Sequence, residues 1–172
     1  MVSKNLRIAG DKLNEDIIRF ARDEFKLLLG ERTAEDIKIA IGSAHELPEP
    51  MEATMRGRDL VTGLPKELIV DDADIRRAMR HSLHVLLNAI KGAIEQTPPE
   101  LVADIMHRGI TLVGGGSLLR GLDRLIHEET KIPVRVAEDP LTAVVRGTGI
   151  ILEDIESMKN MLAKVEKERT II

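Results

Sequence analysis

The sequence predicts an α/β fold with two subdomains, and three observations carry that prediction. Apolar residues recur at spacings of three and four through most of the chain, as along residues 75–94, which is typical of amphipathic helices. A short apolar run at 110–113 is typical of a buried strand, and three consecutive glycines follow it. Within residues 50–70 apolar and polar residues alternate instead, which indicates half-buried strands. We therefore expect a β-rich insertion within a helical and α/β remainder.

The composition narrows the class of protein. Of the 172 residues, 43% are apolar and 31% charged, as in soluble globular proteins, and the net charge of −4 gives no electrostatic reason to expect nucleic-acid binding. The chain has no cysteine and only two phenylalanines as aromatic residues, so we expect neither disulfides nor base-stacking surfaces. No apolar run approaches the ~20 residues that span a bilayer. We also expect no signal peptide.

The first 42 residues are predicted to form one strand and two helices. Residues 4–9 are a strand candidate. Asp11 is expected to cap a helix that ends at Gly30. Thr33 is expected to begin a second helix, which ends at Gly42.

The middle of the chain is predicted to form a hairpin followed by the longest helix. The hairpin has a first strand at 51–56, a turn at 57–63 and a return strand at 64–70. Asp71 or Asp72 is expected to cap the long helix, because either side chain could accept a hydrogen bond from its first turn.

The last third is predicted to alternate between helices and strands. The predicted elements are a helix begun by Thr97-Pro98-Pro99-Glu100 and reaching about His107, a strand at 110–113, a glycine turn, a helix at 117–129, a strand at 132–137, a helix from Pro140 past Gly147 and an amphipathic tail helix.

The glycine turn at Gly114–Gly116 is the first candidate for a binding site. Without β-carbons, a flat ligand can approach the bare backbone, and the amides of a helix opened by Ser117 would lack intrahelical partners. These features suit a nucleotide. However, Leu119 occupies the position of the third glycine in the dinucleotide fingerprint, and no Gly-Lys-Ser/Thr follows. From the residues alone, a simple strand-to-helix turn stays equally open.

Five segments in the same order resemble the MreB family, the bacterial rod-shape-determining actin homologues. They are Gly30–Lys38, Arg56–Pro65, Thr97–Leu101, Gly114–Leu122 and Ala137–Thr142. The resemblance implies the C-terminal half of an actin-like (ribonuclease H-like) ATPase fold. It implies an inner α/β subdomain formed by residues 1–29 and 97–152, an inserted α+β subdomain at 30–96, and a C-terminal helix and tail at 153–172.

The resemblance also implies that the chain contributes the adenosine side of an ATP site. The residues that it places there are Glu35, Asp36, Ile37, Lys38, Gly114, Gly115, Gly116, Ser117 and Leu118. Glu35 and Lys38 would share one helix face, as residues three apart do. By spacing alone, they could equally be a solvated pair on a helix surface.

The hairpins that hold phosphates and magnesium in actin-like ATPases do not occur in this sequence. We therefore expect no catalytic residue and no magnesium ligand in this chain, no ATP hydrolysis by it alone, and at most weak adenosine contact. His81 and His84 share a helix face, but without an obvious third ligand we expect no metal site. An unpaired sheet edge at the strands 4–9 and 110–113 would favour self-association or marginal stability.

The resemblance further implies a role in assembly and cell shape. Members of this family polymerise into paired protofilaments at the inner face of the cell membrane. The expected partners are therefore other copies, a RodZ-like membrane protein and the elongation machinery, with indirect membrane association. Two alternatives are a truncated module that caps or regulates such filaments and a small free-standing nucleotide-binding enzyme. The sequence does not separate MreB itself from a paralogue such as Mbl.

Overall fold

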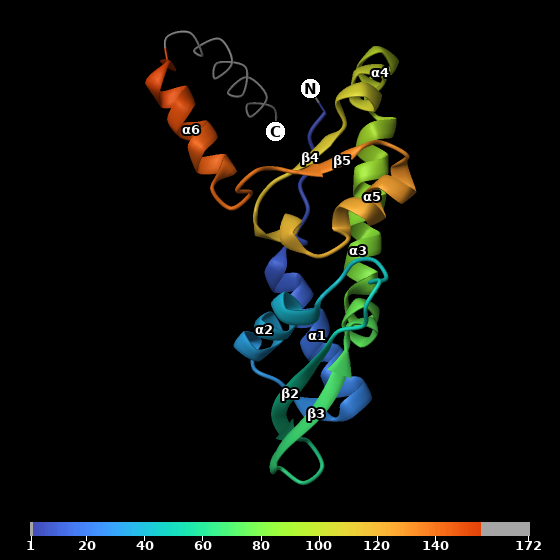
Figure 1. Cartoon of the computed structure of the whole chain (residues 1–172), viewed down its shortest axis with the longest axis vertical. Coiled ribbons are helices and arrows are strands. Elements are labelled where there is room, and N and C mark those ends of the chain that lie inside the picture. Colours follow the sequence, from blue (N-terminus) through green and yellow to red (C-terminus); the bar gives the residue numbers. More distant parts are fainter. Residues whose placement is uncertain (1, 156–172) are drawn as a thin grey trace, which may run out of the picture.

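The computed structural model describes residues 2–155, and these form a mixed α/β fold as predicted (Figure 1). In chain order the elements are α1 (Gly10–Phe25), β1 (Leu27–Leu28), α2 (Glu31–Ile41), β2 (Glu52–Asp59), β3 (Pro65–Asp71), α3 (Asp72–Glu95), α4 (Pro99–Arg108), β4 (Ile110–Leu112), the 3-10 turn η1 (Gly115–Leu118), α5 (Leu122–Thr130), β5 (Val134–Val136) and α6 (Ala143–Glu153). From residue 156 onwards, the predicted tail helix lies outside the described part of the chain.

The strands form two separate sheets. β1, β2 and β3 make an antiparallel sheet, whose β2–β3 hairpin places Met55 opposite Leu68. β4 and β5 pair in parallel, with Thr111 opposite Arg135. The hairpin and the 110–113 and 132–137 strands were all expected from the sequence, although each observed strand is shifted or shortened by a few residues.

One aliphatic core holds α1, α2 and α3 against the three-stranded sheet. α1 packs against both α2 and α3, and Ile17 of α1 and Met79 of α3 are fully buried between them. Met55 is fully buried on the inner face of the hairpin, and Ile126 of α5 packs into the same core. Figure 1 shows the hairpin at one end of α3 and the β4–β5 sheet towards the other. Burial of each such side chain stabilises the fold by about 1.5–3 kcal/mol.

The start of α3 confirms the predicted cap. Asp71 is the residue before the helix, and its Oδ1 accepts a hydrogen bond from the Asp74 N–H at 2.8 Å. This bond satisfies one of the amides that lack a partner in the first turn.

The first thirty residues differ from the prediction in three ways. The N-cap of α1 is Ala9, without a side-chain hydrogen bond, and Asp11 lies inside the first turn, so the predicted Asp11 cap was wrong. Residues 4–9 form no strand and pair with none in the described part, so that assignment was wrong. α1 begins at Gly10 and ends at Phe25, not Gly30, because Lys26 adopts a left-handed conformation with φ 52°. The chain then turns to pair Leu27–Leu28 with β2, so tertiary pairing overrides the helical pattern.

Four helix starts also differ from the prediction, and the first of these is α6, which begins at Ala143 and not at Pro140. α2 begins at Glu31 after Gly30, so Thr33 lies inside the helix and caps nothing. α4 begins at Pro99, while the Thr97 hydroxyl donates to the Ala93 carbonyl of α3 at 2.8 Å. The expected helix at 117–129 is divided into η1 and α5, because Gly121 lies at φ 72° between them and interrupts the helix.

The hairpin turn yields a pH prediction. Hydrogen bonds from the Thr62 and Val61 N–H groups, together with Lys66, lower the pKa of Asp59 from 3.8 to about 2. A depressed pKa in the folded state adds stability above pH 3.8, which is lost as the pH falls towards 2. We expect the free energy of unfolding of Asp59→Asn to fall less than that of the parent chain as the pH drops from 3.8 towards 2, measured by urea unfolding at each pH with circular dichroism. An equal fall in both proteins would contradict the assignment.

Candidate functional site

A pocket of about 730 Å³ lies where the start of α1, one face of α2 and the glycine turn meet. Five of the residues that the resemblance implied line it together, namely Glu35, Lys38, Gly115, Gly116 and Leu118. The two groups are some eighty positions apart in sequence, so the fold alone brings them to one cavity. Glu35 and Lys38 lie one helical turn apart on the α2 face that meets the pocket.

The pocket lysine is held in place by α1. The Lys38 Nζ donates to the Asn14 Oδ1 at 2.7 Å and to the Gly10 carbonyl at 3.1 Å. Asn14 is itself buried, at 3% exposed, so its amide is fixed by the core. An ammonium group has three N–H donors, so one remains for a ligand after these two bonds. The position of Lys38 is therefore set before any ligand arrives.

The glycine turn presents backbone to the pocket. Gly114 has φ 81°, and its N–H donates to the Pro140 carbonyl at 2.8 Å, which fixes the turn against the segment before α6. A Cβ built on Gly116 would meet nothing within 4 Å, and one on Gly115 would lie 3.4 Å from the Leu141 Cδ2. The space beside Gly116 is thus free for a ligand that touches the main chain.

Four of the residues that the resemblance implied do not line the pocket. Ser117 is buried, and its hydroxyl donates to the Gly114 carbonyl at 2.7 Å, so it stabilises the turn beside the pocket. Gly114 adjoins the lining without being part of it. Ile37 is in the core at 4% exposed, and with Asp36 it lines a separate hollow of about 290 Å³ on another face of α2.

Sequence reasoning missed Asn14 and Arg120. The Arg120 guanidinium donates to the Ile39 carbonyl at 2.8 Å, and its own carbonyl accepts from the Ala44 N–H at 2.7 Å. These bonds join the end of α2 to the glycine-turn segment, so they hold the two pocket walls together. No spacing in the sequence marks either residue, because each partner lies on a distant element.

Two negative findings concern the described residues alone. None of the helices between residues 2 and 155 is both long enough and apolar enough to span a bilayer. Within the same range, no group of three or more histidine or acidic side chains is placed to hold a metal ion.

Solved structures of similar shape define the class of fold. Crystal structures of MreB5 of Spiroplasma citri bound to ADP and to AMPPNP superpose with a TM-score of 0.88 at 35% identity, over 94% and 95% of this chain and 48% and 49% of theirs. The MamK double helical filament matches with a TM-score of 0.64 at 21% identity, over 79% of this chain and 42% of that one, which is a likeness of fold. The chain thus has part of an actin-like α/β fold.

Sequence comparison identifies the family. Residues 1–160 match the family model described as MreB/Mbl protein. The cell shape-determining protein Mbl of Bacillus cereus is 46% identical over 158 residues, which are 92% of this chain and 47% of that protein. MreB of Escherichia coli is 49% identical over 154 residues, 90% of this chain and 44% of that protein. The chain belongs to the MreB/Mbl family of cell-shape actin homologues, and it spans about half the length of these relatives.

Proposed function

We propose that this chain carries the adenosine side of the ATP site of an MreB-like protein that polymerises and controls rod cell shape. The observation that carries the proposal is the pocket in which Glu35 and Lys38 face Gly115 and Gly116. The MreB5 structures, with ADP and AMPPNP, support a nucleotide as the ligand class in this family.

The pocket fits the flat, apolar-faced part of a nucleotide. A base or ribose can lie against the bare main chain at Gly116, because no side chain occupies that space. The carboxylate of Glu35 can accept hydrogen bonds from ribose hydroxyls or an exocyclic amine, and Lys38 retains a donor. These residues bind and orient the nucleoside, and we assign them no chemical step.

The proposal includes the division into subdomains. Residues 1–29 and 97–152 would form the inner subdomain and residues 30–96 the inserted one. The separation of the β1–β3 sheet from the β4–β5 sheet supports this, since each sheet belongs mainly to one of the two parts.

The proposal also includes assembly at the membrane. By its resemblance to the family, the protein would form filaments at the inner face of the cell membrane, with a RodZ-like membrane protein and the elongation machinery as partners. Membership of the family and the filament formed by MamK support the assembly.

Gly116→Val tests the pocket directly. The new side chain fits the fold, because no atom lies within 4 Å of its Cβ, but it occupies the space assigned to the nucleoside. We expect adenosine and ATP affinity to fall at least about tenfold, or by about 1.4 kcal/mol, in calorimetric titration.

Gly149→Val is the matched control, since its Cβ also meets nothing within 4 Å but lies on α6. It is expected to leave nucleotide affinity unchanged. Equal affinity in the Gly116 variant and the parent chain, with both proteins folded, would show that the nucleoside does not bind in this pocket.

A further inference from the structure

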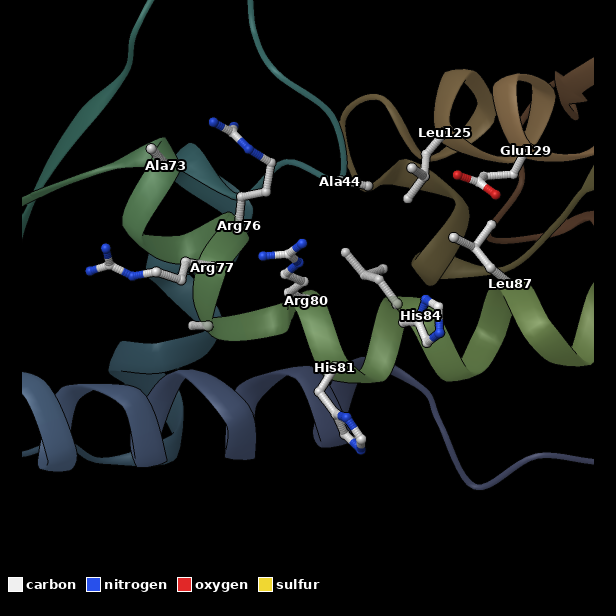
Figure 2. Close-up of a pocket in the computed structure, with 12 residues that line it drawn as sticks. Ala44, Ala73, Arg76, Arg77, Arg80, His81, His84, Leu87, Leu125 and Glu129 are labelled. Carbon is white, nitrogen blue, oxygen red and sulfur yellow. The ribbon is translucent and has the colours of Figure 1, made fainter.

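A second groove, of about 880 Å³, runs along α3 on a different part of the molecule (Figure 2). We name it the α3 groove and define it by Arg80, Leu83 and Leu87 of α3 and by Ala44, Leu125 and Glu129 opposite. It shares no lining residue with the nucleotide pocket.

The groove has an apolar floor. Leu83 and Leu87 are 5% and 6% exposed and Ala44 6%, so they form a continuous part of the core surface. Leu125 is half-buried and lies across from them on α5. A floor of this kind suits an aliphatic side chain inserted between α3 and α5.

The rim of the groove is basic. Its lining includes three arginines and one glutamate, in a chain whose net charge is −4. Arg76 and Arg77 are already paired, with Asp72 at 2.7 Å and Asp74 at 2.9 Å. The single glutamate is paired with Lys91.

Arg80 differs from its neighbours. It is exposed, and no carboxylate among residues 2–155 forms an ion pair with it. Figure 2 shows it pointing from α3 towards the side of Ala44, whereas His81 points the opposite way. An unpaired guanidinium above an apolar floor offers a bidentate site for a carboxylate.

We infer that the α3 groove docks an acidic amphipathic segment of a partner protein. One of its aliphatic side chains lies on the Leu83–Leu87 floor, and a carboxylate one helical turn away pairs with Arg80. A basic segment is disfavoured by the arginines of the rim. A phosphate polymer would contact the rim alone and leave the floor uncovered. This inference stands apart from the proposed nucleotide function.

The test uses the full 172-residue chain and a fluorescein-labelled synthetic peptide with leucine and glutamate at helical spacing. We expect saturable binding in fluorescence anisotropy that weakens as salt rises, and no binding by the matched leucine–lysine peptide. Arg80→Glu is expected to weaken binding at least about tenfold, while Arg80→Lys retains part of it.

Arg146→Glu is the matched control, because Arg146 is also an exposed helical arginine but lies on α6, away from the groove. It makes the same change in net charge and is expected to leave binding within about twofold. Equal weakening by both reversals would overturn the inference, as would equal binding of the lysine peptide. Inorganic polyphosphate that displaces the peptide and binds as tightly, with the same dependence on Arg80, would reassign the groove to polyanions. Thermal unfolding of each variant checks that the substitution has left the fold intact.

Discussion

Gly121→Ala is expected to lower the free energy of unfolding by about 3 kcal/mol or more. Gly121 links η1 to α5 at φ 72°, a conformation that costs alanine about 1–2 kcal/mol. Its Cβ would also lie 2.7 Å from the Cβ of His45 and 3.3 Å from that residue's backbone nitrogen. The loop after α2 would have to move, and with it one wall of the nucleotide pocket.

Gly63→Ala separates these two costs. Gly63 has almost the same φ, 75°, but a Cβ there would meet nothing within 4 Å. We expect this variant to lose only the conformational part, about 1–2 kcal/mol, in urea unfolding followed by circular dichroism. Equal losses at the two glycines would show that the contact with His45 carries no cost.

Arg76→Met is expected to destabilise the fold by about 3 kcal/mol. The Arg76 guanidinium donates to the Asp72 carboxylate at 2.7 Å and to the Ser43 hydroxyl at 2.9 Å. Asp72 is only 5% exposed, so the variant leaves a buried charge without its cationic partner. Equilibrium unfolding in urea measures the loss.

Arg124→Met is the matched control for this ion pair. Arg124 and Glu128 are also four residues apart on a helix, at 3.0 Å, but both side chains are exposed. Such a pair contributes about 0.3–0.5 kcal/mol. A loss at Arg76 no larger than that at Arg124 would contradict the role assigned to burial.

The Arg76 effect should also depend on pH. Burial raises the pKa of Asp72, but hydrogen bonds from the Met51 N–H and from Arg76 outweigh it and hold the pKa below 3.8. The carboxylate therefore contributes stability above that pH and loses it as the pH falls below. The difference between the parent chain and Arg76→Met should narrow as the pH falls below 3.8 and through the lowered pKa of Asp72, because the parent's carboxylate then loses its charge too.

Local chemistry made part of this fold predictable. The Asp71 cap and the helical spacing after it predicted α3, because a capping side-chain oxygen and an apolar stripe suffice to specify a helix. The alternation of apolar and polar residues after Met51 predicted β2 in the same way. The end of α1 was not predictable, since Lys26 is a non-glycine residue in a left-handed conformation that only the pairing of β1 explains.

The same limit applies to the pocket. The spacing of Glu35 and Lys38 placed them on one face, and three glycines marked a bare backbone, but the sequence alone gave no reason to join the two. Resemblance supplied that link, and the pocket geometry is consistent with it. The role of Asn14 was not predicted, because it accepts a hydrogen bond from Lys38, which lies 24 positions away in the sequence. Whether all nine residues implied by resemblance contact a nucleotide stays a prediction.

The hydrogen bond from Arg120 to the Ile39 carbonyl spans 81 positions of the chain. Closing so long a loop costs entropy before any contact compensates for it, and folds rich in such distant contacts form slowly. We expect the cavity between these segments to be completed only after α1, α2 and the glycine turn have come together. During refolding, the ability to bind a nucleoside should therefore return after the helical circular-dichroism signal, which makes it a late marker of maturation.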